Sequence, residues 1–545
     1  MKRDLNKISQ TVFDVLVIGG GIHGAFVALD AAQRGLSVAL VEKGDFGSAT
    51  SSNSLKTVHG GLRYLQDLDL DLVQKMIFER KTYLRIAPHL VHPLPFVVPT
   101  IKKLSRSYTA MRVALGLNDF FGRQRNVDQV VGKELPGSRM LTKAECLDYL
   151  PGLKANEITG GALWYDAQIY NTERFLLNVL KSAVGFGAQI ANYVSAKQIT
   201  TKNGHVTGAR LEDTFTGERF IVEAKQIVNA TGAWIDRLIV DSDFPVTEKL
   251  NYPLTAAWNV VTRKFINHCA AGIFGKNNKL LFVAPWRSYS IAGTVHEAIE
   301  GTPESYNLPI EKVQAFIDEI NATYPASALT LEDVCSIHKG FHHVKSVSKQ
   351  PNKGIKALRR AVVHDHVTDH ALDGLLTIVS VKFTTARAVA EKTVDIICQK
   401  AELPNRSCQT HLTPIYGGDI SDFNEFTRAV ADIDLSVAYG YGSAYKEVFD
   451  STVAHKDQDA DALFSAQVTH AVRHEMAFEL SDVFFRRTDI GSGQTPSMQK
   501  VELCSELMAR ELGWTDHKKH LAIDQFTDQL GKRWPLAQRE APLLT

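Results

Sequence analysis

The first part of the chain changes its hydrophobic period twice, which predicts a strand, a helix and a second strand. Residues 13–18 form a short apolar run rich in β-branched side chains, typical of a buried parallel strand. Apolar positions then recur at helical spacing, at Ala25, Ala28, Leu29 and Ala32. A second apolar run occupies 37–41. This order predicts a βαβ unit with a parallel sheet.

The turn between the first strand and the helix has the pattern G-x-G-x-x-G, with Gly19, Gly21 and Gly24. The first glycine permits a tight turn, the second a close approach to a pyrophosphate, and the third close packing of helix on strand. The helix N-terminus supplies unpaired N–H groups for the phosphates. Glu42 ends the second strand, where a carboxylate can accept the hydroxyl protons of an adenosine ribose. We predict a dinucleotide site; a glycine-rich turn without a ligand is the simpler alternative.

Three later segments, 48–65, 227–234 and 375–387, carry the small and hydroxyl-bearing side chains of nucleotide-binding turns. The candidate cofactor ligands in them are Thr50, Ser51, Ser52, Thr231, Gly232, Lys382, Phe383 and Thr384. No base motif accompanies the hydroxyls, so we expect them to bind a diphosphate rather than act as nucleophiles. Segments so far apart that return to one nucleotide site suit a large flavin better than a compact nicotinamide unit.

At these segments the chain resembles FAD-dependent, quinone-linked glycerol-3-phosphate dehydrogenases within the D-amino-acid-oxidase-like flavoprotein superfamily. The motifs that carry the resemblance are 50–52, 59–64, 229–234, 382–387 and 470–488. The resemblance covers nearly the full length and implies an α/β fold (α+β overall). Its expected parts are a Rossmann-like FAD-binding domain of the D-amino-acid-oxidase/glutathione-reductase-2 type, a mixed-sheet substrate domain and a helical C-terminal domain.

The domain boundaries follow from where these motifs fall. We expect a discontinuous FAD-binding domain built from residues 12–90, 155–236 and 345–404. The substrate domain then comprises 91–154 and 237–344. A linker near Pro404 leads to the helical C-terminal domain at 412–545.

The resemblance implies oxidation of sn-glycerol 3-phosphate to dihydroxyacetone phosphate, by hydride transfer to flavin N5, with the electrons passed to a quinone. It makes Lys382 and Arg360 ligands of the substrate anion, with Arg63 and Tyr64 nearby. For a single arginine, a solvated surface charge is the simpler interpretation. His59 is either a general base or only a hydrogen-bond partner of the flavin loop, and the sequence leaves both open.

The chain departs from the family pattern at three places. His342 stands where the family has a phosphate-binding arginine, and Trp258 stands where it has a histidine near the flavin. The segment 293–296 lacks the family's Thr-Asp pair. Because an imidazole carries charge only when protonated, His342 would grip a phosphate weakly near neutral pH. An FAD-dependent oxidase or dehydrogenase of another small anionic hydroxy or amino acid therefore stays open, as does a non-catalytic FAD-binding protein.

Composition narrows the class of protein further. The chain has 61 Lys and Arg against 60 Asp and Glu, a balance that argues against a nucleic-acid platform. Six separated cysteines without a C-x-x-C pair indicate neither a disulfide framework nor a zinc module. The cluster at 364–370 has metal-ligand residue types, but its context favours a loop, and we expect no metal.

No apolar run is long enough for a membrane span, and the N-terminus lacks a signal-peptide core, so we expect a cytoplasmic protein. Residues 102–125 combine six basic side chains and one acidic side chain with apolar positions at helical spacing. Such a helix either lies on an anionic bilayer or packs as an ordinary surface helix. Since the family is membrane-associated, the resemblance implies peripheral contact with the cytoplasmic face of the inner membrane; a homodimer is also compatible with it.

Overall fold

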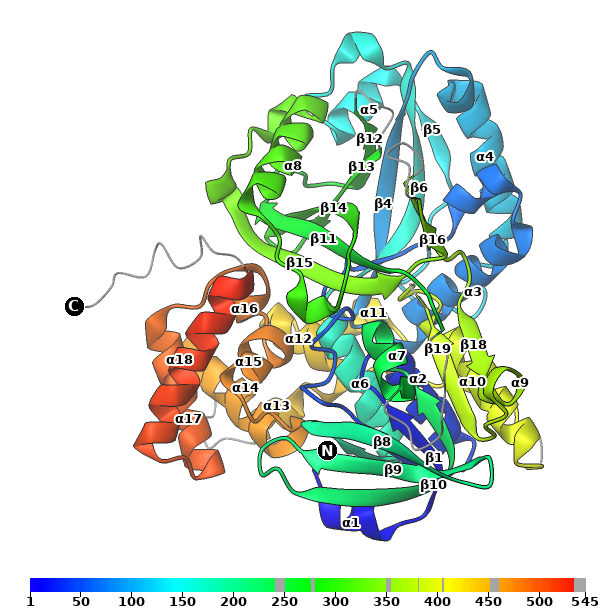
Figure 1. The fold of residues 1–545 in the computed structure, drawn as a ribbon. Coiled ribbons are helices and arrows are strands. Elements are labelled where there is room, and N and C mark those ends of the chain that lie inside the picture. The colour runs from blue at the N-terminus through cyan, green and yellow to red at the C-terminus, as the bar shows by residue number, and fades with distance from the viewer. Residues whose placement is uncertain are drawn as a thin grey trace.

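The structure is a computed structural model that describes residues 1–240, 250–275, 280–348, 354–380, 382–403, 406–450 and 460–533. A first sheet lies at the bottom of Figure 1, a second sheet lies above it, and the C-terminal helices pack at the left. The predicted linker residue Pro404 lies outside the described residues.

The first sheet is built around the predicted βαβ unit. Its main path runs β18-β19-β10-β1-β2-β7, and β8 and β9 extend from β10. The strands are β1 (Phe13–Ile18), β2 (Val38–Val41), β7 (Gln189–Ala191), β8 (Val194–Lys202), β9 (His205–Asp213), β10 (Arg219–Asn229), β18 (Val362–Asp365) and β19 (Leu375–Val379). Strand β1 pairs in parallel with both β2 and β10, and β10 pairs in parallel with β19. The carboxyl ends of these four strands therefore meet at one edge, where α/β proteins bind nucleotides.

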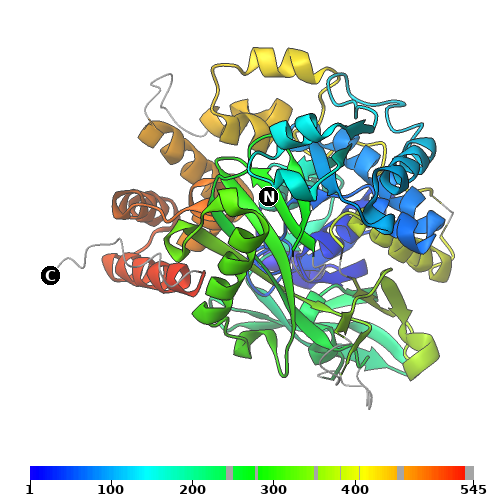
Figure 2. The same cartoon turned by 90° about the horizontal axis from the view of Figure 1, so that it is seen from above.

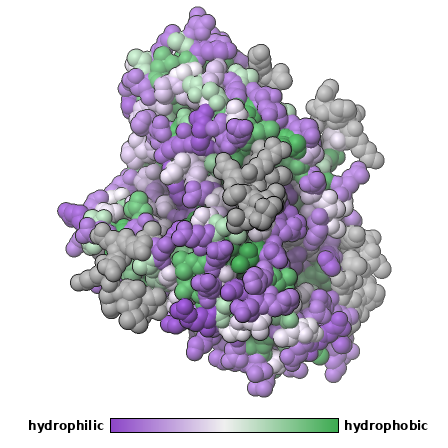
Figure 3. Space-filling model, turned by 90° about the vertical axis from the view of Figure 1, so that its left-hand side faces the viewer, coloured by the Kyte–Doolittle hydropathy of each residue, from purple (hydrophilic) through white to green (hydrophobic). Residues whose placement is uncertain are grey.

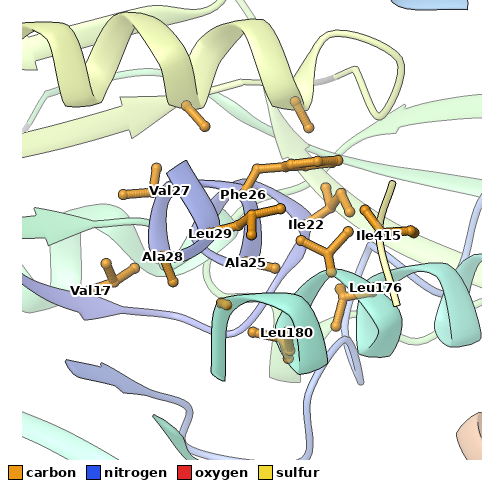
Figure 4. Packing of buried hydrophobic residues seen from close by; sticks show 14 of the residues in the cluster. Val17, Ile22, Ala25, Phe26, Val27, Ala28, Leu29, Leu176, Leu180 and Ile415 are labelled. Carbon is orange, nitrogen blue, oxygen red and sulfur yellow. The ribbon is translucent and has the colours of Figure 1, made fainter. Parts of the chain in front are cut away.

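Helix α2 (Ile22–Gln33) forms the centre of the largest core cluster. It lies between α6 (Thr172–Gly185) and α10 (Ala386–Lys400), as Figure 4 shows. The helix is buried on almost every side, with Phe26 fully enclosed between neighbouring elements. The helix packs closely on β1 at Gly24, where a Cβ would lie 3.3 Å from the Val17 side chain, so the glycine turn is held by this packing.

The second sheet follows the order β15-β11-β14-β13-β12-β4-β6-β3, with β5 on β6. Its strands are β3 (Thr57–Val58), β4 (Val91–Thr100), β5 (Arg139–Leu141), β6 (Gly160–Ile169), β11 (Leu254–Arg263), β12 (Ala270–Phe274), β13 (Leu280–Trp286), β14 (Tyr289–Ala298) and β15 (Val334–His343). The predicted FAD-binding segment 155–236 includes β6, yet β6 pairs along its length with β4. This strand therefore lies with the second sheet, because its backbone hydrogen bonds are satisfied there.

The remaining elements cover the sheets and build the C-terminal part. Around the sheets lie α1 (Leu5–Gln10), α3 (Leu70–Ile86), α4 (Tyr108–Phe121), α5 (Lys143–Tyr149), α7 (Ile235–Val240), α8 (Ile310–Thr323), α9 (His366–His370), and the short strands β16 (Ser346–Val347) and β17 (Ile355–Lys356). The C-terminal helices are α11 (Phe423–Ala429), α12 (Leu435–Tyr441), α13 (Lys446–Asp450), α14 (Ala460–Glu475), α15 (Leu480–Asp482), α16 (Ile490–Gly493), α17 (Met498–Leu512) and α18 (Asp516–Arg533). Seen from above, the C-terminal helices form a separate layer beside the sheets (Figure 2).

Exposed apolar side chains gather on and just before α4. On the side of the molecule drawn in Figure 3, hydrophilic side chains predominate and hydrophobic areas are scattered. On α4, which lies at the upper right of Figure 1, Val113 and Phe120 are 59% and 60% exposed. Leu104, just before this helix, is 91% exposed. Within the described residues, no helix has both the length and the apolarity to cross a bilayer.

Candidate active site

A cavity of about 630 Å³ lies between the carboxyl ends of β1, β2 and β10 and one face of the second sheet. Several predicted cofactor residues line it, namely Gly19, Gly21, Glu42, Thr50, Ser51, Thr231, Gly232, Lys382 and Phe383. Residues from four distant stretches of the chain therefore meet in one space, as the sequence predicts. Gly24, Ser52 and Thr384 are not among the lining residues.

The glycine turn has the geometry that a dinucleotide requires. Gly19 has a φ of 113°, and a Cβ there would lie 2.5 Å from the carbonyl oxygen of Ala230. A Cβ at Gly24 would lie 1.9 Å from the oxygen of Gly19, so this glycine acts through packing of α2 on β1 rather than by touching a ligand. At Gly21 a Cβ would meet only Ser51 Oγ, at 3.2 Å, so the backbone there faces the cavity closely. The turn fits the diphosphate of a dinucleotide.

Glu42 is held at the end of β2 by the glycine turn itself. Its carboxylate accepts hydrogen bonds from Gly20 N at 2.7 Å and Gly44 N at 3.0 Å. Burial raises the pKa of Glu42, and the two backbone N–H groups oppose that effect. Beside it, Lys43 Nζ lies 3.6 Å from the centre of the Trp234 ring. This end of the cavity combines a ribose-binding carboxylate with a flat aromatic side chain.

The 48–55 loop is joined to both sides of the cavity. Ser51 Oγ accepts a hydrogen bond from Ile22 N, at the start of α2, at 3.0 Å. Thr50 Oγ1 donates to Phe341 O at 2.8 Å and accepts from Phe341 N at 2.9 Å, which ties the loop to β15. Ser52 instead is buried and donates to Ala49 O at 3.2 Å, so its role is to shape the loop.

His23 is a cavity residue that the sequence analysis did not select. Its Nε2 is a buried nitrogen without a hydrogen-bond partner in the part of the chain that is described. Burial lowers the pKa of His23 to about 4, so the ring is neutral near pH 7. An unsatisfied buried polar atom at the first turn of α2 is what a bound phosphate oxygen or ribose hydroxyl would satisfy. Its place within the G-x-G-x-x-G pattern was the available sequence signal.

The second-sheet side of the cavity is polar. Asn259, Thr294, His296 and His342 line it, and Thr294 Oγ1 donates to Asn259 Oδ1 at 2.8 Å. The family pattern led us to expect Trp258 near the flavin, but Trp258 is not among the residues that line the cavity. It is 1% exposed, packs edge-on against Phe316, and donates to Glu297. Side chains alternate along β11, so its neighbours Ala257 and Asn259 line the cavity instead.

Lys382 lies at the junction of β19 and α10 and lines the cavity, as predicted. Its Nζ donates to Arg359 O and sits 4.4 Å from the centre of the Tyr64 ring. Phe383 beside it also lines the cavity, and its carbonyl accepts a hydrogen bond from Tyr83 at 3.0 Å. Thr384 is buried and lies two residues before the start of α10.

Arg360 is not brought into the cavity. Its guanidinium pairs with Asp69 at 2.5 Å and with Asp71, and neighbouring Arg359 pairs with Asp67 at 3.2 Å. These ion pairs join the 355–360 segment to the 3₁₀ turn Leu62–Asp67 and the start of α3. A role for Arg360 as ligand of the substrate anion, which stays a prediction, would require it to exchange these carboxylates for the substrate.

His59 and Arg63 lie beside the cavity rather than in its lining. His59 Nδ1 is 3.1 Å from Asp166 Oδ2, and Asp166 also accepts from Gly60 N and from Arg80, each at 2.7 Å. Burial would raise the pKa of Asp166, but the hydrogen bond with His59 and the charge of Arg80 outweigh it and lower the pKa to about 2. This arrangement favours the interpretation of His59 as a residue that holds the flavin loop. Its role as a base stays untested.

The C-terminal helices reach the cavity loop through Asp45, a residue that the sequence analysis missed. Asp45 is fully buried and accepts hydrogen bonds from Arg486, from Arg487 and, at 2.9 Å, from Asn192. The two arginines lie in the π-helical turn Val483–Arg487. Burial by itself would raise the pKa of Asp45, but the charges of Arg487 and Arg486 lower it to about 2. No local sequence signal links Asp45 to residues so far along the chain.

A second buried cluster, formed by Arg174, Glu475 and Tyr441, also joins the C-terminal helices to the rest of the protein. Arg174 donates to both carboxylate oxygens of Glu475, at 2.5 and 3.0 Å, and to Tyr441 Oη at 2.9 Å. It also donates to the carbonyl of Arg487 at 2.8 Å. Charge-assisted hydrogen bonds therefore hold α6, which packs against α2, to the C-terminal helices.

The comparison with protein families decides the assignment of this fold and site. A family profile described as FAD dependent oxidoreductase matches residues 14–348. The chain belongs to the FAD-dependent oxidoreductase family. A second profile, described as the C-terminal domain of alpha-glycerophosphate oxidase, matches residues 408–519. FAD, predicted from the sequence, is confirmed as the cofactor, and this cavity, which the glycine turn lines, is where we expect it to bind.

Curated relatives extend over nearly the whole chain. A glycerol-3-phosphate dehydrogenase of Synechocystis is 29% identical over 97% of this chain and 98% of its own length. The mitochondrial glycerol-3-phosphate dehydrogenase of Macaca fascicularis is 31% identical over 94% of this chain and 72% of its own length. The predicted membership of this flavoprotein family is confirmed.

Solved structures confirm the predicted fold class. The FAD complex of glycerol-3-phosphate dehydrogenase from Bacillus halodurans matches with a TM-score of 0.76, at 24% identity, over 97% of this chain and 96% of that one. The L-alpha-glycerophosphate oxidase of Mycoplasma pneumoniae, with FAD bound, has a TM-score of 0.53 at 15% identity, over 71% of this chain and 95% of that one. At these identities the likeness concerns the fold alone.

The histidine-rich segment near α9 was weighed above as a metal site. His366 is buried and its Nε2 lies 2.8 Å from Thr377 Oγ1, so it serves the fold. The side chains of Asp369 and His370 lie outside the described residues. Within the described part of the chain, no group of three or more His, Cys, Asp or Glu side chains is arranged to hold a metal ion.

Proposed function

We propose that this FAD-dependent oxidoreductase oxidises sn-glycerol 3-phosphate to dihydroxyacetone phosphate and passes the electrons to a quinone. The observation that carries the proposal is a flavin cavity with a polar second-sheet side and cationic groups on the first-sheet side, beside relatives over nearly the whole chain that are named for this substrate. Among the described residues, one carboxylate lines the cavity, that of Glu42, and it belongs to the glycine end. The cationic lining residues are Lys43, Lys197, Arg237 and Lys382. Such a balance favours an anionic ligand.

The residues of this chain have separable tasks in such a reaction. When bound, the flavin supplies the two-electron oxidant for a C–H bond next to a hydroxyl group. Lys382 brings a positive charge to the N-terminal end of α10, whose dipole adds to it. Asn259 has its carbonyl oxygen engaged by Thr294, which leaves its amide N–H groups as donors to a substrate hydroxyl. Phe383 and Phe341 line the cavity and exclude water from it.

The electron acceptor and the membrane contact belong together in this proposal, because a quinone is dissolved in the bilayer. Helix α4 buries Leu115 and Asn118 against the protein and exposes Val113, Leu117 and Phe120. Basic side chains flank these positions, at Lys102, Lys103, Arg106, Arg112, Arg123 and Arg125. Exposed apolar groups flanked by cations suit peripheral binding to the cytoplasmic leaflet. We propose α4 as the contact.

The substrate is tested by mixing the yellow, FAD-loaded protein with glycerol 3-phosphate in the absence of oxygen. We expect bleaching of the flavin absorbance, followed by recovery when a soluble quinone analogue is added. Lys382→Met should retain FAD but bleach at least about 100-fold more slowly, because the cationic group at the substrate is lost. Lys202→Met, on a solvent-facing strand end, is the matched control and should react normally.

A second candidate substrate class has one observation in its favour. The second-sheet side of the cavity carries two neutral histidines, His296 and His342, where an arginine would bind a phosphate more strongly. A hydroxy acid or amino acid with a single carboxylate therefore also suits the cavity. Flavin that stays oxidised with glycerol 3-phosphate but bleaches with a 2-hydroxy acid or an amino acid would establish this alternative and overturn the first proposal.

A further inference from the structure

Two histidines from different strands meet on the second-sheet side of the cavity. His342 Nε2 lies 3.3 Å from His296 Nδ1, and both side chains line the cavity. His342 belongs to β15 and His296 to β14, the strands on either side of β11. Opposite them on β11 stand Thr255 and Ala257 respectively. Because Ala257 carries only a methyl group, the imidazoles can reach each other diagonally across the central strand.

The hydrogen bonds determine how the neutral pair is protonated. His342 Nδ1 lies 3.2 Å from the carbonyl oxygen of His343, which can only accept, so this nitrogen carries the hydrogen. His342 Nε2 is therefore an acceptor, and His296 Nδ1 donates to it. A neutral imidazole has one hydrogen only, so His296 Nε2 carries a lone pair. The pair thus offers an acceptor at its free end, and one added proton would turn that end into a cationic donor.

The charged groups around the pair are cationic. Arg63 acts on His296 from the 3₁₀ turn Leu62–Asp67. The imidazole that adjoins His342 on β15 is that of His343. Lys382 lines the same cavity. The acidic neighbour on β14, Glu297, belongs to the opposite face of the sheet, where it accepts from Trp258 and Tyr306 and pairs with Lys312. No acidic residue among the described cavity-lining residues can therefore neutralise a proton on the pair; Glu42 is engaged with the glycine turn.

We propose that His296, held in place by His342, binds the anionic group of the substrate, and that the bound anion brings one proton onto the pair. This inference rests on the proposed function and deepens it, because it names the group that receives the substrate's oxyanion and the charge change that accompanies binding. The proton adds at His296 Nε2 and is donated to the anion in a charge-assisted hydrogen bond. A phosphate dianion gains more from this than a carboxylate does, so the pair favours the phosphorylated substrate class.

Without an anion the pair stays neutral. Burial lowers the pKa of His342 to about 4, and burial together with the charge of Arg63 lowers the pKa of His296. An opposite charge in contact raises the pKa of an imidazole, so anion binding and protonation reinforce each other. Since the folded, ligand-free pair is deprotonated near neutral pH, affinity should strengthen as pH falls, by up to about tenfold per pH unit.

The test is calorimetric titration of the oxidised, FAD-loaded protein with sodium sulfate, which does not titrate near neutrality, and in parallel with dihydroxyacetone phosphate. Measuring in buffers of different ionisation enthalpy, slightly above neutral pH, counts the protons taken up. We expect about one proton per anion, with affinity falling about tenfold per unit rise in pH. His296→Gln should abolish the uptake and weaken binding, while the exposed His517→Gln is the matched control and should keep both.

A second variant guards against loss of folding. His342→Arg supplies a permanent charge at the pair, so anion binding should persist with no proton uptake and little dependence on pH. Proton uptake retained in His296→Gln, binding without uptake in the unmodified protein, or no sulfate binding at all would each overturn the inference. Flavin bleaching by glycerol 3-phosphate reports separately on the proposed function. Proton uptake on sulfate binding without such bleaching would refute glycerol 3-phosphate as the substrate and leave the anion site standing.

Discussion

Asp45 connects the cavity loop to the C-terminal helices, and replacing it by asparagine would remove one charge while keeping nearly the same shape. In the folded protein its carboxylate faces Arg486 and Arg487; the side chains of Asp45 and Arg487 are fully buried and that of Arg486 is 6% exposed. Taking away one partner of such a buried group leaves uncompensated charge, which costs about 3–5 kcal/mol. Asp45→Asn should therefore loosen the contact between the 43–51 loop and Val483–Arg487.

The pKa of Asp45 points in the same direction. Burial would raise this pKa, but the charges of Arg487 and Arg486 outweigh burial and lower the pKa from 3.8 to about 2, so the ionised carboxylate stabilises the folded protein. Because the folded pKa is depressed, this contribution is present above the unfolded value of 3.8 and is lost as pH falls through about 2. The asparagine variant should lack this part of the acid sensitivity.

The loop that Asp45 holds lines the FAD cavity, so the loss should appear in cofactor affinity. Each 1.4 kcal/mol or so of loop ordering that is lost weakens binding about tenfold, and we expect FAD to bind about 10- to 100-fold more weakly. Flavin fluorescence during stepwise dilution measures the dissociation constant, and thermal unfolding with added FAD measures its linkage to stability. Glu511→Gln, which breaks an exposed ion pair with Arg473, is the control and should change little. Unchanged FAD affinity and unchanged unfolding in Asp45→Asn would refute the reasoning.

Further predictions concern the glycine turn, the His59 loop and α4. Gly24→Ala places a methyl group 1.9 Å from the carbonyl oxygen of Gly19, so it should cost about 1–3 kcal/mol in chemical unfolding and leave the purified protein colourless; a yellow variant of normal stability would contradict this. Asp166→Asn should cost about 3–5 kcal/mol in urea unfolding at pH 7. The stability from the depressed pKa of Asp166 is present above 3.8 and lost as pH falls through about 2, so the variant should lose that acid-dependent part, and an unaltered pH profile would count against it. Leu117→Glu combined with Phe120→Glu should reduce binding to anionic liposomes more than about tenfold without changing flavin reduction by substrate, and undiminished co-sedimentation would rule out α4 as the contact.

Local features of the fold could be predicted from the sequence because period and turn chemistry act over a few residues. The strand at Phe13–Ile18, the glycine turn and the helix after it follow from apolar spacing and from the need for glycine at close approaches. The apolar spacing at 375–387 likewise predicts a strand-to-helix junction at Lys382, and in the structure this lysine lines the cavity.

Contacts between distant segments could not be predicted in this way. Side chains alternate along β11, so Ala257 and Asn259 face the cavity while Trp258 points to the other side, and the sheet around the strand decides which of its faces meets the cavity. Arg360 pairs with Asp69 and Asp71, which lie far from it in the chain, so its sequence neighbours gave no hint of its partners.

The cluster around Asp45 also has a consequence for how the protein is made. The chain emerges from the ribosome N-terminus first, and the glycine turn and its loop are therefore synthesised long before Arg486 and Arg487. Until those arginines arrive, the nascent chain must keep a carboxylate solvated that the finished protein buries completely. We therefore expect tight capture of FAD to be a late event that follows the synthesis of Arg486 and Arg487, so a shortage of FAD would accumulate full-length apoprotein.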